Sequence, residues 1–162
     1  MLLYKLSTPL EKLRKYIEKL FKKYGKAPTL LLDAACGTGG FSNEFAKLGI
    51  EVIGADMSEE MLSIARESAM EQGNDILFLC QRLEELDLYG TADAFLCMID
   101  GINYCINQNA IYDMIKRIKT LSMKKLYISV NMRRRLLKMQ RFYIARENRE
   151  QKTGLCKIAW IL

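Results

Sequence analysis

Apolar side chains occur in two kinds of pattern along this chain, one with helical spacing and one of short continuous runs. Residues 9–24 carry apolar side chains three or four positions apart, with lysines on the opposite face, which predicts an amphipathic helix. The same spacing predicts three later helices, at residues 39–49, 58–73 and 109–121. Short, continuously apolar runs predict buried strands at residues 29–36, 51–56, 75–80, 91–100 and 125–130.

The order of these elements indicates a single α/β domain. Strands that alternate with helices pair in parallel through right-handed crossovers, and continuously apolar strands need helices on both faces of the sheet. We therefore expect a Rossmann-like, doubly wound, mostly parallel sheet in one domain that spans residues 1–162. Its expected parts are an N-terminal helix (1–28), a core (29–131) and a basic C-terminal segment (132–162) with a helix at about 132–147 and a strand at 155–162.

The composition argues against several classes of protein. No apolar run reaches the roughly 18–20 residues of a membrane-spanning helix, and the N-terminal apolar stretch is too short for a signal peptide. Five cysteines show no metal-binding spacing, and Cys80 and Cys97 lie in apolar runs, so we expect both to be buried. The chain has no histidine, which argues against a catalytic triad or a histidine-ligated metal. We expect a cytoplasmic protein without a metal site.

The net charge of +6 comes from the C-terminal segment. Residues 133–162 contain nine Lys and Arg against two Asp and Glu, whereas residues 1–132 contain 16 against 17. Seven of these basic residues fall within residues 133–149, and Phe142 and Tyr143 lie between them. Such basic side chains could contact the phosphates of a nucleic acid, and the aromatic rings could stack on its bases. A solvated basic helix explains the pattern more simply, so a nucleic-acid-binding module is an alternative function and not the favoured one.

A glycine-rich turn, Asp33-Ala-Ala-Cys-Gly-Thr-Gly39, joins the first predicted strand to the next helix. Gly37 and Gly39 have no Cβ, so the backbone can turn sharply and approach a ligand closely. The first N–H groups of the helix face the same place, and Asp33 can accept a hydrogen bond from an ammonium group or from water around a ligand. Because parallel α/β sheets bind ligands at the carboxyl ends of their strands, the turn is a candidate nucleoside-cofactor site.

Asp56 ends the second predicted strand, 19 residues after Gly37. An acidic side chain at this place can accept hydrogen bonds from both hydroxyl groups of a ribose. The alternative interpretation needs no ligand: the glycines form a tight turn between strand and helix, and Asp56 caps the next helix. The combination of strand, glycine-rich turn, helix, second strand and terminal acid favours the cofactor site.

This stretch resembles motifs I and II of the class I S-adenosylmethionine-dependent methyltransferases, over about residues 24–104. In that family the motifs read (L/V)LDxGCGTG, then a strand with an acidic end, then S-x-x-M-L-x-x-A. The matching residues are Asp33, Cys36, Gly37, Thr38, Gly39, Asp56, Ser58, Met61, Leu62 and Ala65.

The resemblance implies that S-adenosyl-L-methionine is the cofactor and that its methyl group passes to a small-molecule acceptor. Asp33 and the glycine loop would face the methionine part, Asp56 the ribose, and Met57 would pack on the adenine. The expected cofactor-binding residues are Asp33, Ala35, Cys36, Gly37, Thr38, Gly39, Asp56, Met57, Gln81, Arg82, Leu83 and Met98. Asp100 and Tyr104 follow the fourth strand and are the candidate catalytic residues that face the acceptor. The alternative is that Asp100 is an ordinary loop carboxylate and Tyr104 a packed aromatic residue.

A nicotinamide-dependent dehydrogenase is the rival interpretation of the glycine loop. Its fingerprint needs Gly or Ala three positions after the second glycine, and Ser42 stands there. It also binds a pyrophosphate at the helix N-terminus, which the carboxylate of Asp33 would repel. A cofactor with an ammonium and a sulfonium group suits Asp33 better. Methyl transfer from a sulfonium needs mainly positioning and desolvation, so the lack of histidine is compatible with it.

The chain departs from the family pattern in three places. Arg82 stands where relatives carry an acid that accepts a hydrogen bond from the adenine amino group, and a guanidinium only donates. Residues 121–126 replace a Pro-Gly-Gly-type turn, and relatives continue for two more strands. These departures suggest a chain truncated or frame-altered after about residue 122. A catalytically impaired domain that binds S-adenosylmethionine without turnover is therefore a further alternative.

Overall fold

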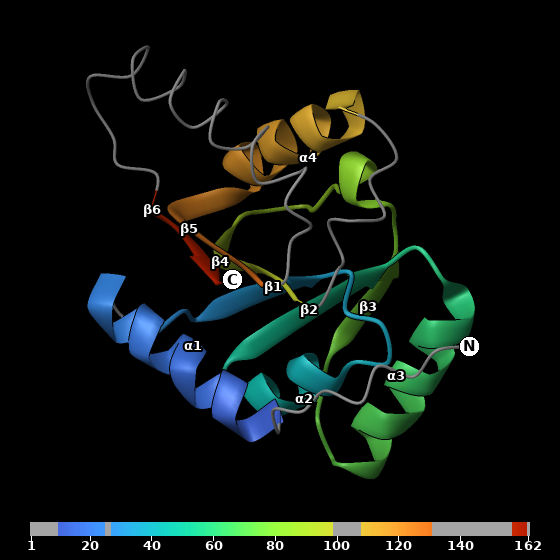
Figure 1. The fold of residues 1–162 in the computed structure, drawn as a ribbon. Coiled ribbons are helices and arrows are strands. Elements are labelled where there is room, and N and C mark those ends of the chain that lie inside the picture. Colours follow the sequence, from blue (N-terminus) through green and yellow to red (C-terminus); the bar gives the residue numbers. More distant parts are fainter. Residues whose placement is uncertain (1–9, 25–26, 99–107, 131–156, 162) are drawn as a thin grey trace.

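Six strands form one sheet with helices on both sides (Figure 1). In this computed structural model the described residues are 10–24, 27–98, 108–130 and 157–161. The elements are α1 (Leu10–Tyr24), β1 (Leu30–Ala34), α2 (Gly40–Ala46), β2 (Glu51–Asp56), α3 (Glu59–Glu71), β3 (Leu77–Cys80), the 3-10 helix η1 (Leu83–Glu85), β4 (Ala92–Cys97), α4 (Gln108–Leu121), β5 (Ser122–Val130) and β6 (Lys157–Ile161).

The strands lie in the order β3-β2-β1-β4-β5-β6, and every neighbouring pair is parallel. From β1 the chain adds β2 and β3 on one side and then returns to add β4, β5 and β6 on the other. The order therefore reverses between β1 and β4, and this is the switch point at which doubly wound sheets bind their ligands. The predicted Rossmann-like, doubly wound fold is confirmed.

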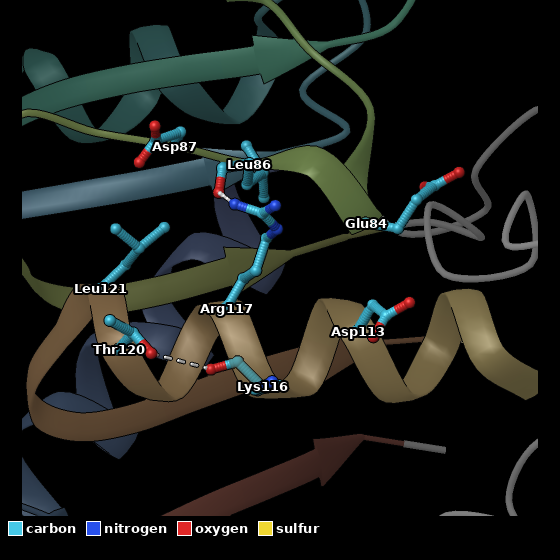
Figure 2. Close-up of a pocket in the computed structure, with 8 residues that line it drawn as sticks. All are labelled: Glu84, Leu86, Asp87, Asp113, Lys116, Arg117, Thr120 and Leu121. Carbon is cyan, nitrogen blue, oxygen red and sulfur yellow. Dashed lines mark hydrogen bonds between the residues drawn. The ribbon is translucent and has the colours of Figure 1, made fainter.

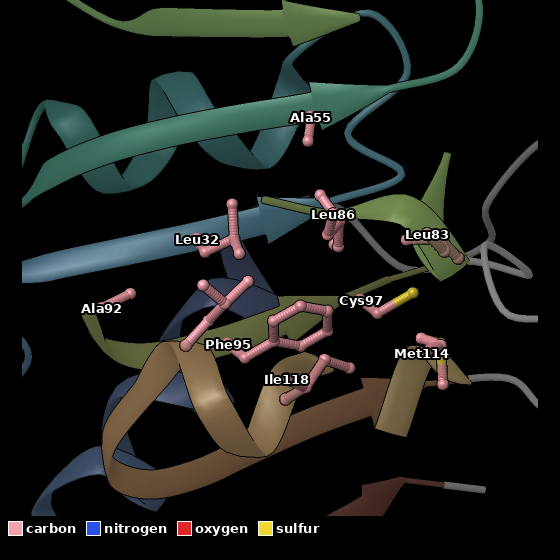
Figure 3. Packing of buried hydrophobic residues seen from close by; sticks show 11 residues of the cluster. Leu32, Ala55, Leu83, Leu86, Ala92, Phe95, Cys97, Met114 and Ile118 are labelled. Carbon is pink, nitrogen blue, oxygen red and sulfur yellow. The ribbon is translucent and has the colours of Figure 1, made fainter. Parts of the chain in front are cut away.

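The helices cover the two faces of the sheet as two groups (Figure 1). On one face, α1 and α2 bury an apolar cluster against β1, β2 and β4, in which the rings of Phe21 and Phe45 lie 5.9 Å apart. On the other face, α4 and η1 cover a second cluster around Leu32 and Phe95 (Figure 3). Leu31 and Leu32 are both fully buried on opposite faces, which is why β1 is continuously apolar.

The predicted elements are present where the structure describes the chain, mostly with shorter bounds. Ser58 caps α3, since its side chain accepts a hydrogen bond from the backbone N–H of Met61 at 3.3 Å. The C-terminal strand is confirmed as β6. The helix predicted at 132–147 lies outside the described residues, and η1 was not predicted.

One burial prediction is wrong. Cys97 is 1% exposed, as expected, but Cys80 is exposed. The reason is that Cys80 ends β3, an edge strand of the described sheet, which has a neighbour on one side only. Three cysteines fall within the described residues, and all three are free thiols. No helix in the described part of the chain is both long and apolar enough to cross a membrane.

Candidate functional site

The loop between β1 and α2 turns by means of three residues in the left-handed backbone region. Ala35 has φ 56°, Gly37 has φ 56° and Gly39 has φ 74°. A Cβ on Gly39 would also lie 3.1 Å from the Cβ of Ala65 and 3.3 Å from the ring of Phe78. Both the positive φ and the tight space therefore favour glycine at position 39. Ala35 adopts the same backbone region with a side chain, at a cost of about 1 kcal/mol.

Hydrogen bonds fix this loop to the end of β2. The backbone N–H of Cys36 donates to the carbonyl oxygen of Ala55 at 3.0 Å, and that of Gly39 donates to the carbonyl oxygen of Cys36 at 3.0 Å. The N–H of Gly37 donates to Oδ2 of Asp56 at 2.8 Å. The predicted glycine loop and the predicted acidic residue thus lie in direct contact.

The carboxylate of Asp56 joins the glycine loop to the start of α3. Its Oδ1 accepts from the N–H of Ser58 at 2.9 Å, while Oδ2 accepts from Gly37. The capping role expected for Asp56 without a ligand is wrong, because Ser58 is the N-cap of α3 and Asp56 holds the backbone of that residue. Each carboxylate oxygen has two lone pairs, so each keeps one for a further donor such as a hydroxyl group. The two contacts that Asp56 makes are therefore compatible with its predicted ligand-binding role.

Asp33 is enclosed by α2 and does not lie open at the strand end. Its side chain is 1% exposed, and Oδ2 accepts a hydrogen bond from the hydroxyl group of Ser42 at 2.6 Å. Burial raises the pKa of Asp33 to about 7; the Ser42 hydrogen bonds oppose this rise, and the charge of Asp56 adds to it. Sequence reasoning did not single out Ser42 as a partner of Asp33. A hydroxyl residue in the first turn of the following helix, close in space to the strand end, is the signal that could have found it.

Cys36 lies beside these two acids. Burial raises the pKa of its thiol above the ordinary value, and the charges of Asp33 and Asp56 raise it further. A thiol held in the protonated form is a poor nucleophile. Cys36 is therefore a packing residue of the loop and not a candidate for covalent catalysis.

The segment after β3 runs alongside the end of β2. The N–H of Gln81 donates to the carbonyl oxygen of Asp56 at 3.0 Å, and its Oε1 accepts from the N–H of Asp87 at 3.1 Å. Nε of Arg82 pairs with Oε1 of Glu84 at 2.8 Å. Leu83 is buried, with 8% of its surface exposed. The guanidinium that breaks the family pattern thus has an acidic partner two residues away.

The remaining predicted residues have contrasting environments. Met57 is 54% exposed at the end of β2, whereas Met98 is 4% exposed in the cluster beneath α1 and α2. Asp100 and Tyr104 lie outside the described residues, as does the basic stretch 133–149. Within the described part of the chain, no group of three or more potential metal ligands occurs.

A cavity of about 480 Å³ lies between the segment after β3 and α4 (Figure 2). Nη1 of Arg117 donates to the carbonyl oxygen of Leu86 at 3.3 Å within it. Its lining residues are Glu84, Leu86, Asp87, Asp113, Lys116, Arg117, Thr120 and Leu121. None of these belongs to the predicted cofactor site, so the cavity and the glycine loop are separate features.

Solved structures share this fold. A S-adenosylmethionine-dependent methyltransferase from Clostridium acetobutylicum superposes with a TM-score of 0.70 and 24% identity, over 74% of this chain and 49% of that one. The magnesium protoporphyrin IX methyltransferase from Synechocystis, crystallised with its bound S-adenosylmethionine, has a TM-score of 0.56 and 28% identity, over 70% and 53%.

Sequence comparisons agree with the structural ones. A putative methyltransferase from Geobacillus is 32% identical over 114 residues, which is 70% of this chain and 46% of that protein. The chain spans about half the length of the curated relatives it matches. The family described as "Methyltransferase domain" matches residues 31–123, from β1 into β5. The chain therefore belongs to the family of class I S-adenosylmethionine-dependent methyltransferases.

Proposed function

We propose that this chain binds S-adenosyl-L-methionine at the carboxyl ends of β1, β2 and β3 and transfers its methyl group to a small-molecule acceptor. The observation that carries the proposal is the contact between Asp56 and the N–H of Gly37, which places an acid with spare lone pairs beside a glycine-rich loop. Gly37 supports the fit, because a Cβ there would meet no atom within 4 Å, so the loop borders open space at the residue that contacts Asp56.

Each part of the cofactor has complementary groups in this proposal. Ala35, Cys36, Gly37, Thr38 and Gly39 present backbone to the methionine part, since a loop with three left-handed residues brings peptide groups close to a ligand. The ammonium and sulfonium groups are cationic, and an ionised Asp33 attracts both from behind the loop. The two ribose hydroxyl groups donate to the free lone pairs of Asp56.

The adenine would lie between Met57 and the segment after β3. The half-exposed side chain of Met57 offers an apolar surface to one face of the ring. Gln81, Arg82 and Leu83 would border the edge of the ring. The ion pair with Glu84 balances the positive charge of the Arg82 guanidinium at this place. Met98 supports the site from within the core, at 4% exposure.

The bound cofactor supplies an activated methyl group, so the protein has to position the acceptor in line and exclude water. Asp100 and Tyr104 are the proposed acceptor-facing residues. Small acceptors occur among relatives, which include a magnesium-protoporphyrin O-methyltransferase and a ubiquinone biosynthesis O-methyltransferase, while another relative methylates 23S rRNA. We also propose a cytoplasmic location, in keeping with the three free cysteines of the described residues.

The proposal is tested by a thermal shift of the full chain with S-adenosylmethionine, S-adenosylhomocysteine and NAD in parallel. A ligand that binds only the native state raises the unfolding midpoint by mass action. We expect the first two to raise it and NAD to leave it unchanged. Stabilisation by NAD alone would overturn the choice of cofactor. A methyl-release assay on small amines and acids then separates a transferase from a domain that binds without turnover.

A further inference from the structure

Asn43 is a buried polar residue that the proposed function does not use. It lies in α2 with 2% of its surface exposed. Its side-chain Nδ2 donates to the carbonyl oxygen of Gly39 at 3.0 Å, and its backbone N–H donates to the same oxygen at 2.9 Å. The last carbonyl group of the glycine loop is therefore held by two donors from one residue.

Asn74 continues this connection to the turn after α3. Its Nδ2 donates to Oδ1 of Asn43 at 2.8 Å. Its backbone N–H donates to the carbonyl oxygen of Ala69 at 2.9 Å, which attaches the residue to the end of α3. The carbonyl oxygen of Gly39 can only accept, so the amide of Asn43 must turn its nitrogen toward Gly39 and its oxygen toward Asn74. The chain of hydrogen bonds thus has one direction, from Asn74 through Asn43 to Gly39.

The consequence for the loop follows from the planarity of the peptide bond. The C=O and N–H groups of a trans peptide point in opposite directions, so fixing the carbonyl group of Gly39 also fixes the direction of the N–H of Gly40. Two consecutive glycines restrict the backbone less than any other pair of residues. Their orientation therefore depends on neighbours, and Asn43 is the neighbour that holds it.

We propose that Asn43 and Asn74 are positioning residues for cofactor binding, which hold the end of the glycine loop in its binding conformation, Asn43 from within α2 and Asn74 from the turn after α3. This inference rests on the proposed binding of S-adenosylmethionine. It assigns a function to the turn after α3, whose hydrogen bonds reach the loop through Asn43. A cofactor that must first order the Gly39–Gly40 peptide binds more weakly by the free energy of that ordering.

The test compares Asn74→Ala with Gln72→Ala in the full chain. Gln72 lies in the same turn, but its Nε2 donates to the carbonyl oxygen and the hydroxyl group of Ser68, within the end of α3. The dissociation constant of S-adenosylmethionine is measured by calorimetry well below the unfolding midpoint of each variant. We expect Asn74→Ala to raise it about fivefold, the equivalent of one neutral hydrogen bond, and Gln72→Ala to leave it within twofold.

Two further readouts separate positioning from a purely structural role. The backbone amide resonances of Gly39 and Gly40 in the free protein should shift in Asn74→Ala and stay in place in Gln72→Ala. Because the two asparagines act in series, adding Asn74→Ala to Asn43→Ala should raise the dissociation constant no further. If Asn43→Ala does not fold, the comparison of Asn74→Ala with Gln72→Ala decides alone.

The outcomes also separate this inference from the proposed function. If the wild-type chain binds no S-adenosylmethionine, the proposed function fails and the positioning role fails with it. If the wild type binds but Asn74→Ala changes only the unfolding midpoint, with unchanged affinity and glycine resonances, the asparagines merely stabilise the fold. In that case the proposed function stands and the positioning role is overturned.

Discussion

Replacing Asp33 by Asn should stabilise the protein at neutral pH, although Asp33 belongs to the proposed site. A carboxylate with 1% exposure is costly to ionise, which is why its pKa rises from 3.8 to about 7. Between these two pH values the folded state keeps the proton and the unfolded state loses it. The free energy of unfolding therefore falls as the pH rises through this window, and the contribution of Asp33 is constant above it.

The size of the effect follows from the pKa. A rise from 3.8 to about 7 corresponds to at most about 4 kcal/mol, at about 1.4 kcal/mol for each tenfold change in the proton equilibrium. Asn can still accept the hydrogen bond of Ser42, and the effect of this bond on the carboxylate is already included in the pKa. We expect Asp33→Asn to be up to about 4 kcal/mol more stable than the wild type at pH 8, with this advantage disappearing toward pH 4.

Urea unfolding followed by circular dichroism, from pH 5 to pH 8.5, measures this difference. The window is favourable because the chain has no histidine, whose charge would otherwise change in the same range. The α-amino group is common to both proteins and cancels in the comparison. An Asp33→Asn protein that is less stable than the wild type at pH 8, or a stability difference that does not vary with pH, would show that ionising Asp33 does not destabilise the folded protein. The same variant should bind S-adenosylmethionine more weakly, because it cannot carry the charge that attracts the cation.

Three further substitutions probe the loop and its surroundings. Gly54→Ala should cost about 2–3 kcal/mol of stability in urea unfolding, because a Cβ there would lie 2.6 Å from two ring atoms of Phe78; a neutral result would contradict the packing. Ala35→Gly should raise the unfolding free energy by about 0.5–1 kcal/mol, since it relieves a φ of 56° and restores the glycine of the family motif; a comparable loss would contradict the assigned conformation. Asp56→Ala leaves the N–H of Gly37 without its acceptor and should lower both stability, by about 1–2 kcal/mol, and affinity for S-adenosylmethionine, by more than tenfold; retained affinity in calorimetry would exclude Asp56 as the ribose acceptor.

The fold could be predicted from the sequence because its signals are local and periodic. Continuous apolar runs such as the one around Leu31 and Leu32 require cover on both faces, and this requirement implies a parallel sheet between two helical layers. The position of a strand within the sheet is not local information. Cys80 shows the difference, because its apolar run predicted burial, whereas β3 lies at an edge of the described sheet and leaves the thiol exposed.

The candidate site was predictable as a set of residues but not as a set of contacts. The spacing of Gly37 and Asp56 predicted that they belong together, and the structure joins them by a hydrogen bond of 2.8 Å. The enclosure of Asp33 by Ser42 depends on how α2 packs over β1, which no motif describes. The link from Asn74 to Asn43 spans 31 residues of sequence and joins a surface turn to a buried helix. Contacts of this kind depend on the three-dimensional packing and not on the spacing of residues.

Calorimetric titration of the full chain with S-adenosylmethionine measures whether the glycine loop and Asp56 hold this cofactor, with Asp56→Ala as the matched variant and NAD as the matched ligand. We predict saturable binding of one S-adenosylmethionine per chain to the wild type, at least tenfold weaker binding to Asp56→Ala, and no heat of binding with NAD. A folded wild-type chain that takes up NAD, or that gives no binding heat with S-adenosylmethionine at any temperature tested, would contradict this prediction.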